Sequence, residues 1–161
     1  HILLTESCVE LVNAAEKSSA QSQGLWEHAE RYAKQMIADF NNYSEGWIDW
    51  NMALHEQGGP NHVGNFCGAH VTVDSKTGKV TYNPSFYYVG HFSRYIQPGA
   101  RRVLCANDNS ADLFSCAYEN PDGSRVAVVL NTGWVRTIAF IADGKGRNIT
   151  LPPRSITTVL F

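Results

Sequence analysis

Long hydrophobic runs are missing from this sequence of 161 residues. No stretch approaches the roughly 20 apolar residues that a membrane-spanning helix needs. Blocks of like charge are missing too, and the formal net charge is only −2. Nucleic acid therefore has no electrostatic support as a partner. The hydrophobic fraction of 43% and the charged fraction of 17% indicate a folded globular chain rather than a disordered one.

The opening stretch, HILLTESCVE, lacks an initiator methionine and the basic start and apolar middle of a signal peptide. Residues 2–4 are apolar without polar alternation, which favours a parallel strand buried on both faces. Glu6 follows at the carboxyl end of that strand, where α/β barrels and open sheets place their active groups. A solvated loop glutamate is the alternative. We expect the chain to be the carboxy-terminal fragment of a longer protein.

Cysteine is scarce, and the spacing of the four cysteines matches no Cys-x-x-Cys or zinc-ribbon motif. Cys105 and Cys116 fall in two candidate neighbouring strands, RVLCAN and DLFSCAY. A turn between Asn109 and Asp112 would place them nearly opposite, within reach of a disulfide after a small adjustment. We expect that bridge, with two small buried thiols as the alternative. Cys8 is expected to be a buried thiol.

A metal site and glycosylation sites are also considered. His55, His62, Cys67 and His70 lie close together in the sequence but match structural zinc poorly, so we expect no metal. Asn42 and Asn148 each begin an Asn-x-Ser/Thr sequon. Two sequons and an expected disulfide favour the secretory pathway.

The elements expected along the chain fall into two groups. A helix over residues 25–40, a strand in EGWIDWNMAL, a hairpin in HVTVDSKTGKVTY and a helix from Pro84, capped by Asn83, follow the first strand. Strand, helix, strand, helix in that order favours two βα units of a parallel sheet. After residue 99 come six short β-branched segments separated by turn signals, typical of an antiparallel sandwich.

A candidate binding site follows the second expected strand, in GWIDWN. Trp47 and Trp50 flank Asp49, and Asn51 comes next. Flat aromatic faces stack on sugar rings, while Asp and Asn bind sugar hydroxyls. Core packing is the alternative and is preferred for Trp47.

Five stretches in order along the chain, LLTESC, GWIDWNMAL, GGPNHVGNF, YNPSFYYVGHFSRYIQPGARRV and NPDGSRVAVVLN, resemble the glucosylceramidases of glycoside hydrolase family 30. The resemblance implies an α/β plus all-β fold. Residues 1–99 would form the last two βα units, with strands seven and eight, of a (β/α)8 TIM barrel. Residues 100–161 would form the family's antiparallel β-sandwich domain.

The resemblance also implies a retaining β-glucosidase that hydrolyses glucosylceramide without a cofactor. Glu6 matches the nucleophile, while Trp50 and Asn65 match residues that line the glucosyl pocket. Asp49 joins them as a predicted substrate-binding residue. The family's acid/base glutamate lies in an Asn-Glu-Pro motif, and this sequence has none. His62 and Gly64 stand where animal members tend to carry tryptophan and arginine, so the pocket rim is expected to differ.

Partners and location are implied by resemblance alone. They are a glycolipid substrate, a saposin-type activator, peripheral contact with a lipid membrane, the missing amino-terminal part of the barrel, and a lysosomal or secreted location. Because one carboxylate is missing, the isolated chain is expected to be inactive. The alternative is a non-catalytic fragment or subunit that binds a glycan or protein partner.

Overall fold

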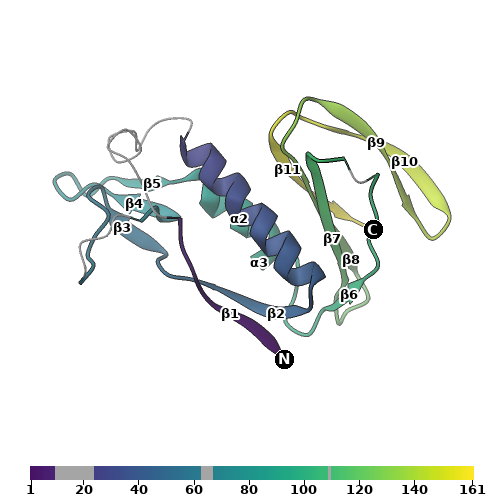
Figure 1. The fold of residues 1–161 in the computed structure, drawn as a ribbon, viewed down its shortest axis with the longest axis horizontal. Helices are drawn as coiled ribbons and strands as arrows, with labels where there is room; N and C mark the ends of the chain where they lie inside the picture. The colour runs from purple at the N-terminus through teal and green to yellow at the C-terminus, as the bar shows by residue number, and fades with distance from the viewer. Residues whose placement is uncertain (10–23, 63–66, 109) are drawn as a thin grey trace. The chain divides into compact units, whose positions relative to one another are not determined.

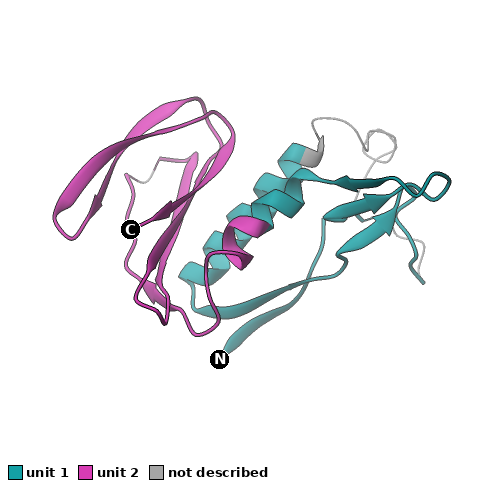
Figure 2. Cartoon of the chain, turned by 180° about the vertical axis from the view of Figure 1, so that it is seen from behind, with its two compact units in different colours: residues 1–89 teal, residues 90–161 magenta. Residues whose placement is uncertain are grey.

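The computed structural model describes residues 1–9, 24–62, 67–108 and 110–161. These residues form two compact units, His1–Val89 and Gly90–Phe161, coloured separately in Figure 2. The division falls inside helix α3 (Pro84–Ser93), earlier in the chain than the boundary at residue 99 expected from the sequence.

Unit 1 begins with the expected βα unit. Strand β1 (Ile2–Ser7) pairs in parallel with β2 (Ser44–Asp49), and helix α2 (Gly24–Asn41) lies between them in the sequence and beside them in space (Figure 1). The predicted spacing of apolar residues is confirmed, since these residues lie on one buried face of the helix. The buried apolar residues on that face are Ala29, Tyr32, Ala33, Met36 and Ile37.

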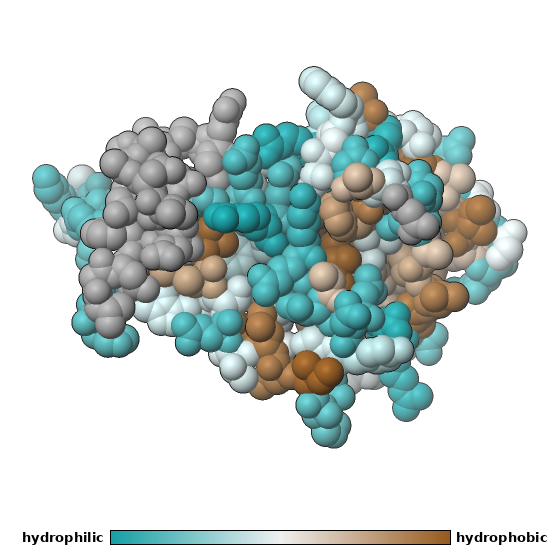
Figure 3. Space-filling view, in the orientation of Figure 1, coloured by the Kyte–Doolittle hydropathy of each residue, from teal (hydrophilic) through white to brown (hydrophobic). Residues whose placement is uncertain are grey.

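Strand β1 is more exposed than the sequence predicted. Ile2 and Leu3 keep 58% and 52% of their surface in water, and Figure 3 shows hydrophobic side chains at the surface near the amino terminus. The expectation of a strand buried on both faces is therefore wrong for this chain. Within the described residues β1 pairs with β2 alone, so one of its edges carries no neighbouring strand.

A second, three-stranded sheet follows in unit 1. Strand β3 (Ala53–His55) pairs in parallel with β4 (Val71–Val73), and β4 forms the expected hairpin with β5 (Val80–Tyr82). The sequence analysis had not identified β3 as a separate strand. The hairpin turn is held by Asp74, whose carboxylate accepts hydrogen bonds from the backbone N–H groups of Lys76 and Thr77 at 3.0 and 2.7 Å.

Unit 2 contains the six strands expected after residue 99. They are β6 (Arg101–Val103), β7 (Leu113–Glu119), β8 (Arg125–Asn131), β9 (Arg136–Ala142), β10 (Lys145–Leu151) and β11 (Ser155–Leu160). A four-stranded antiparallel sheet has the order β11-β8-β7-β6, and β9 and β10 form a separate hairpin.

The core of unit 2 lies between that sheet and the hairpin. Strand β8 is central and almost wholly buried, whereas β9 alternates between half-buried and exposed residues. Ile138 and Phe140 of β9 pack against buried side chains of the sheet, including Val129 and Ala127. A cavity of about 630 Å³ remains between the two layers.

The expected disulfide between Cys105 and Cys116 is not formed, since neither cysteine is bridged. The register is the reason. Val103 pairs with Ala117, which brings Cys105 toward Ser115, and the Cys105 thiol donates a hydrogen bond to the Ser115 hydroxyl at 3.3 Å. Successive residues of a strand point to opposite faces, so Cys116 faces away and is fully buried.

Candidate active site

The carboxyl ends of β1 and β2 bring the predicted nucleophile to the predicted binding residues. Ser7 is paired with Asp49, and its carbonyl accepts a hydrogen bond from the backbone N–H of Trp50 at 2.7 Å. Glu6, one residue before Ser7, is exposed. Glu6, Asp49 and Trp50 therefore lie at the same end of the parallel pair, the end that carries active groups in parallel-sheet enzymes.

Asp49 is a buried acceptor rather than a solvated carboxylate. Its side chain is only 11% exposed and contacts His70 Nε2 at 2.9 Å through Oδ2. The phenol of Tyr32, from α2, donates to Oδ1 and Oδ2 at 3.1 and 3.2 Å. Burial, together with the negative charge of Asp49 and this hydrogen bond, raises the pKa of Tyr32 far above its usual value. Tyr32 is therefore a neutral donor across the physiological range.

Sequence reasoning missed the role of Tyr32 and His70. Tyr32 is one position of the helix expected over residues 25–40, and His70 belongs to the group that matches structural zinc poorly. In the structure His70 contacts Asp49, and its ring packs against the Tyr32 ring with centroids 5.1 Å apart. The described residues hold no group of three or more side chains suited to a metal ion.

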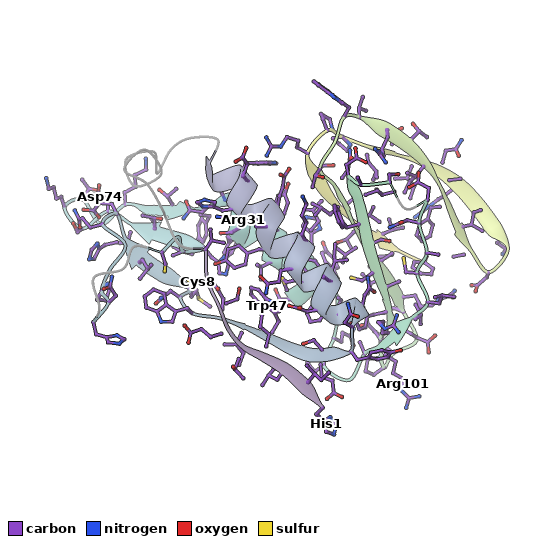
Figure 4. All side chains as sticks on the ribbon, viewed as in Figure 1. His1, Cys8, Arg31, Trp47, Asp74 and Arg101 are labelled. Atoms are coloured by element: carbon purple, nitrogen blue, oxygen red, sulfur yellow. The ribbon has the colours of Figure 1, made fainter. Side chains whose placement is uncertain are left out.

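The two tryptophans have different surroundings. Trp47 donates from Nε1 to Asp39 at 3.2 Å and meets Tyr32 edge-on, with ring centroids 5.6 Å apart. It therefore joins β2 to α2, as preferred from the sequence (Figure 4). Trp50 is half-buried and packs against the cluster of Leu54, Cys67 and Ala69. The rest of its surface is not covered by the described residues.

The other predicted residues are placed as follows. Asn65 lies outside the described residues. Asn42 is exposed at the end of α2, and its side-chain amide donates to the Ala38 carbonyl at 2.8 Å. Asn148 is exposed on β10. The side-chain nitrogen of Asn51 is buried without a hydrogen-bond partner among the described residues.

In unit 1, the charged side chain of Glu56 is bound by the turn between β4 and β5. Glu56, just after β3, accepts hydrogen bonds from the hydroxyl and the backbone N–H of Ser75 at 2.5 and 2.8 Å. These bonds, the hydroxyl first, lower the pKa of the Glu56 carboxyl to about 2. The contact ties the end of β3 to the β4–β5 turn.

Comparison with known proteins decides the family. Residues 1–96 match the glycosyl hydrolase family 30 TIM-barrel domain, and residues 99–159 match the glycosyl hydrolase family 30 beta sandwich domain. The chain belongs to glycosyl hydrolase family 30. The fold expected from the sequence, the end of a TIM barrel followed by a β-sandwich, is confirmed.

Individual relatives agree with the family. Lysosomal acid glucosylceramidase of Mus musculus is 41% identical over 67% of this chain, and putative glucosylceramidase 4 of Caenorhabditis elegans is 31% identical over 99%. The crystal structure of SrfJ from Salmonella typhimurium superimposes with a TM-score of 0.88 at 35% identity over 99% of this chain.

The match covers only part of each relative. The chain spans 21% of the mouse protein, 31% of the nematode protein and 34% of SrfJ. Helices long and apolar enough to cross a membrane do not occur among the described residues.

Proposed function

We propose that the protein carrying this chain is a retaining β-glucosidase that hydrolyses glucosylceramide to glucose and ceramide, with Glu6 as its nucleophile. The observation that carries the proposal is the position of Glu6, which is exposed at the carboxyl end of the parallel strand β1. The next residue, Ser7, pairs with Asp49 and accepts a hydrogen bond from the backbone N–H of Trp50. Family membership and the glucosylceramidases among the relatives support the substrate class.

The proposed reaction needs two carboxyl groups about 5–5.5 Å apart. A Glu6 oxygen attacks the anomeric carbon as the bond to the ceramide oxygen breaks, and a second carboxyl group gives that oxygen its proton. A water then loses a proton to the second group, attacks the same carbon and releases Glu6. No Asn-Glu-Pro sequence occurs in the chain, so the second group comes from elsewhere in the protein.

The neighbours of Glu6 supply binding and position. The open face of Trp50 stacks on the glucosyl ring, and Asn65 binds a hydroxyl at the pocket. Asp49 was predicted to bind substrate, but its carboxylate is engaged by Tyr32 and His70. Its role in this proposal is therefore to hold the end of β2, and with it Trp50, in position. No metal or cofactor takes part in this scheme.

For the isolated chain, a non-catalytic role is the second candidate. Ile2 and Leu3 are exposed on β1, and the sandwich retains its cavity of about 630 Å³. Both features are accounted for if the amino-terminal part of the barrel pairs with β1 and supplies further strands to the sandwich. Measurable turnover of an aryl β-glucoside by the purified 161-residue chain would overturn this candidate.

Location and partners follow from the same proposal. A lysosomal or secreted location agrees with two exposed sequon asparagines, Asn42 and Asn148, and with the mouse relative, a lysosomal acid glucosylceramidase. A saposin-type activator and peripheral contact with a lipid membrane would then present the glycolipid to the enzyme.

The experiment is a comparison of Glu6→Gln with Glu45→Gln in the intact protein. Glu45 is an exposed carboxylate on neighbouring β2. We expect Glu6→Gln to lose activity on glucosylceramide by several orders of magnitude and Glu45→Gln to keep it. With the unsubstituted protein, NMR of the glucose first released should show the β anomer. Full activity in Glu6→Gln, or an α anomer as first product, contradicts the proposal.

A further inference from the structure

Two cysteines that are far apart in the sequence meet beside the proposed nucleophile. The Sγ atoms of Cys8 and Cys67 lie 3.2 Å apart across a sequence separation of 59 residues. Cys8 follows Glu6 by two residues at the end of β1, and its position is marked in Figure 4. A disulfide bond is about 2.05 Å long, so the two sulfur atoms need to approach by only about 1 Å.

The backbone around the pair is already held in place. The Gly68 N–H donates a hydrogen bond of 2.8 Å to the Val9 carbonyl, immediately beside both cysteines. This hydrogen bond joins the segments that carry the two cysteines. The remaining approach of the two sulfur atoms is about 1 Å, starting from 3.2 Å.

The two thiols differ in access. Cys8 is exposed, so the expectation of a buried thiol there is wrong. Cys67 is 2% exposed and belongs to the cluster with Leu54 and Ala69. An exposed thiol can meet a small oxidant from solution, and a buried neighbour can then resolve the product. This arrangement differs from that of Cys105 and Cys116, which point to opposite faces of their sheet.

We propose that Cys8 and Cys67 are a reversible dithiol–disulfide site that exchanges with a low-molecular-weight disulfide such as oxidised glutathione. The Cys8 thiolate attacks one glutathione sulfur, forms a mixed disulfide and expels one glutathione thiolate, which takes up the proton that Cys8 lost. Cys67 then loses its proton, attacks the Cys8 sulfur and expels the second glutathione. Two protein thiols are oxidised, and one glutathione disulfide is reduced to two thiols.

The bridge would tie the end of the Glu6 strand to the segment that leads to His70. His70 in turn contacts Asp49 of β2 at 2.9 Å, so the bridged segment also touches the end of β2, through a non-covalent contact. An oxidising compartment would hold this end of the barrel unit in its bridged form. The bridge does not depend on Glu6 being catalytic.

The test is non-reducing peptide mapping of the intact protein after equilibration in glutathione buffers of graded potential. We expect a cross-linked peptide pair containing Cys8 and Cys67 under oxidising conditions, two hydrogen masses lighter than the separate peptides. Adding reductant should remove it and lower the thermal midpoint. Cys105→Ser should still form the link, whereas Cys8→Ser and Cys67→Ser should not, and their thermal midpoints should not respond to reductant.

Two results would overturn the proposal. One is alkylation of both Cys8 and Cys67 at every potential, which would mean that neither thiol exchanges. The other is a stable glutathione adduct on Cys8 with Cys67 still alkylatable, which would mean that the second step does not occur. Because the readout is mass, a loss of the proposed catalytic function would leave this result unaffected.

Discussion

Tyr32 and Asp49 are joined by a phenol hydroxyl that donates to both oxygens of a buried carboxylate, at 3.1 and 3.2 Å. The relationship connects helix α2 to the end of β2, next to Trp50. His70 approaches the same carboxylate from the segment before β4. Three elements therefore converge on one acidic side chain beside the proposed nucleophile.

Replacing Tyr32 with Phe should lower the free energy of unfolding by an amount that depends on pH. Because the folded pKa of Tyr32 is raised, its contribution to stability is complete below its ordinary pKa of about 10 and is lost as the pH rises above it. We expect Tyr32→Phe to cost about 1.5–3 kcal/mol near pH 7, the effect of removing a donor to a charged acceptor. The difference from wild type should shrink above pH 10 in urea unfolding. A difference that is constant from pH 7 to 11 would contradict the prediction.

Ser75→Ala should change the titration of Glu56. Without the Ser75 hydroxyl, the pKa of Glu56 should rise from about 2 toward its ordinary 4.5. A depressed pKa contributes stability above pH 4.5, lost as the pH falls toward 2, and the variant should lose part of that contribution. NMR titration of the Glu56 carboxyl measures the shift. Thr77→Ala is the control, since Thr77 binds Asp74 instead. An unchanged Glu56 titration in Ser75→Ala would refute the assignment.

Cys116 should be unreactive in the native protein. Burial, with a smaller effect from Cys105, raises the pKa of the Cys116 thiol to about 12, and the thiolate is the reactive form. Alkylation with iodoacetamide at pH 8 should leave Cys116 unmodified until the protein is unfolded. Recovery of a Cys105–Cys116 linked peptide from the native protein would contradict the structure at this position.

Asn131 should be essential to the stability of the sandwich. It is fully buried at the end of β8, and its side-chain amide donates to the carbonyls of Trp134 and Pro152, both at 2.8 Å. Asn131→Ala leaves these acceptors without their donor and should cost about 2 kcal/mol. Asn148→Ala, exposed on β10, should change stability by less than about 0.5 kcal/mol in unglycosylated protein. Equal effects in urea unfolding would show that the Asn131 contacts contribute little.

The sequence predicted the elements better than their pairing. The spacing of Ala29, Met36 and Ile37 is enough to predict α2, because a helix buries one face whatever it packs against. Short β-branched segments likewise predicted the strands after residue 99. The Cys105–Cys116 disulfide failed because it depended on register, and a one-residue shift moves a side chain to the opposite face of the sheet.

The site was predictable only in part. A carboxylate after a buried strand is common, and the role of Glu6 came from resemblance rather than from spacing. The meeting of Tyr32, Asp49 and His70 joins positions on a helix, a strand and a loop. No local pattern encodes such a contact, because it depends on how those elements pack. The Cys8–Cys67 contact was missed for the same reason.

The role of Glu6 can be tested by covalent capture. The intact protein is treated with a mechanism-based cyclitol epoxide, digested and analysed by mass spectrometry, because a retaining nucleophile forms an ester with such a reagent. The proposed mechanism predicts one label per active site, on the peptide containing Thr5-Glu6-Ser7, with fragment ions placing it on Glu6 and activity lost in proportion. A label on any other carboxylate, with Glu6 unmodified in inactivated protein, would contradict it.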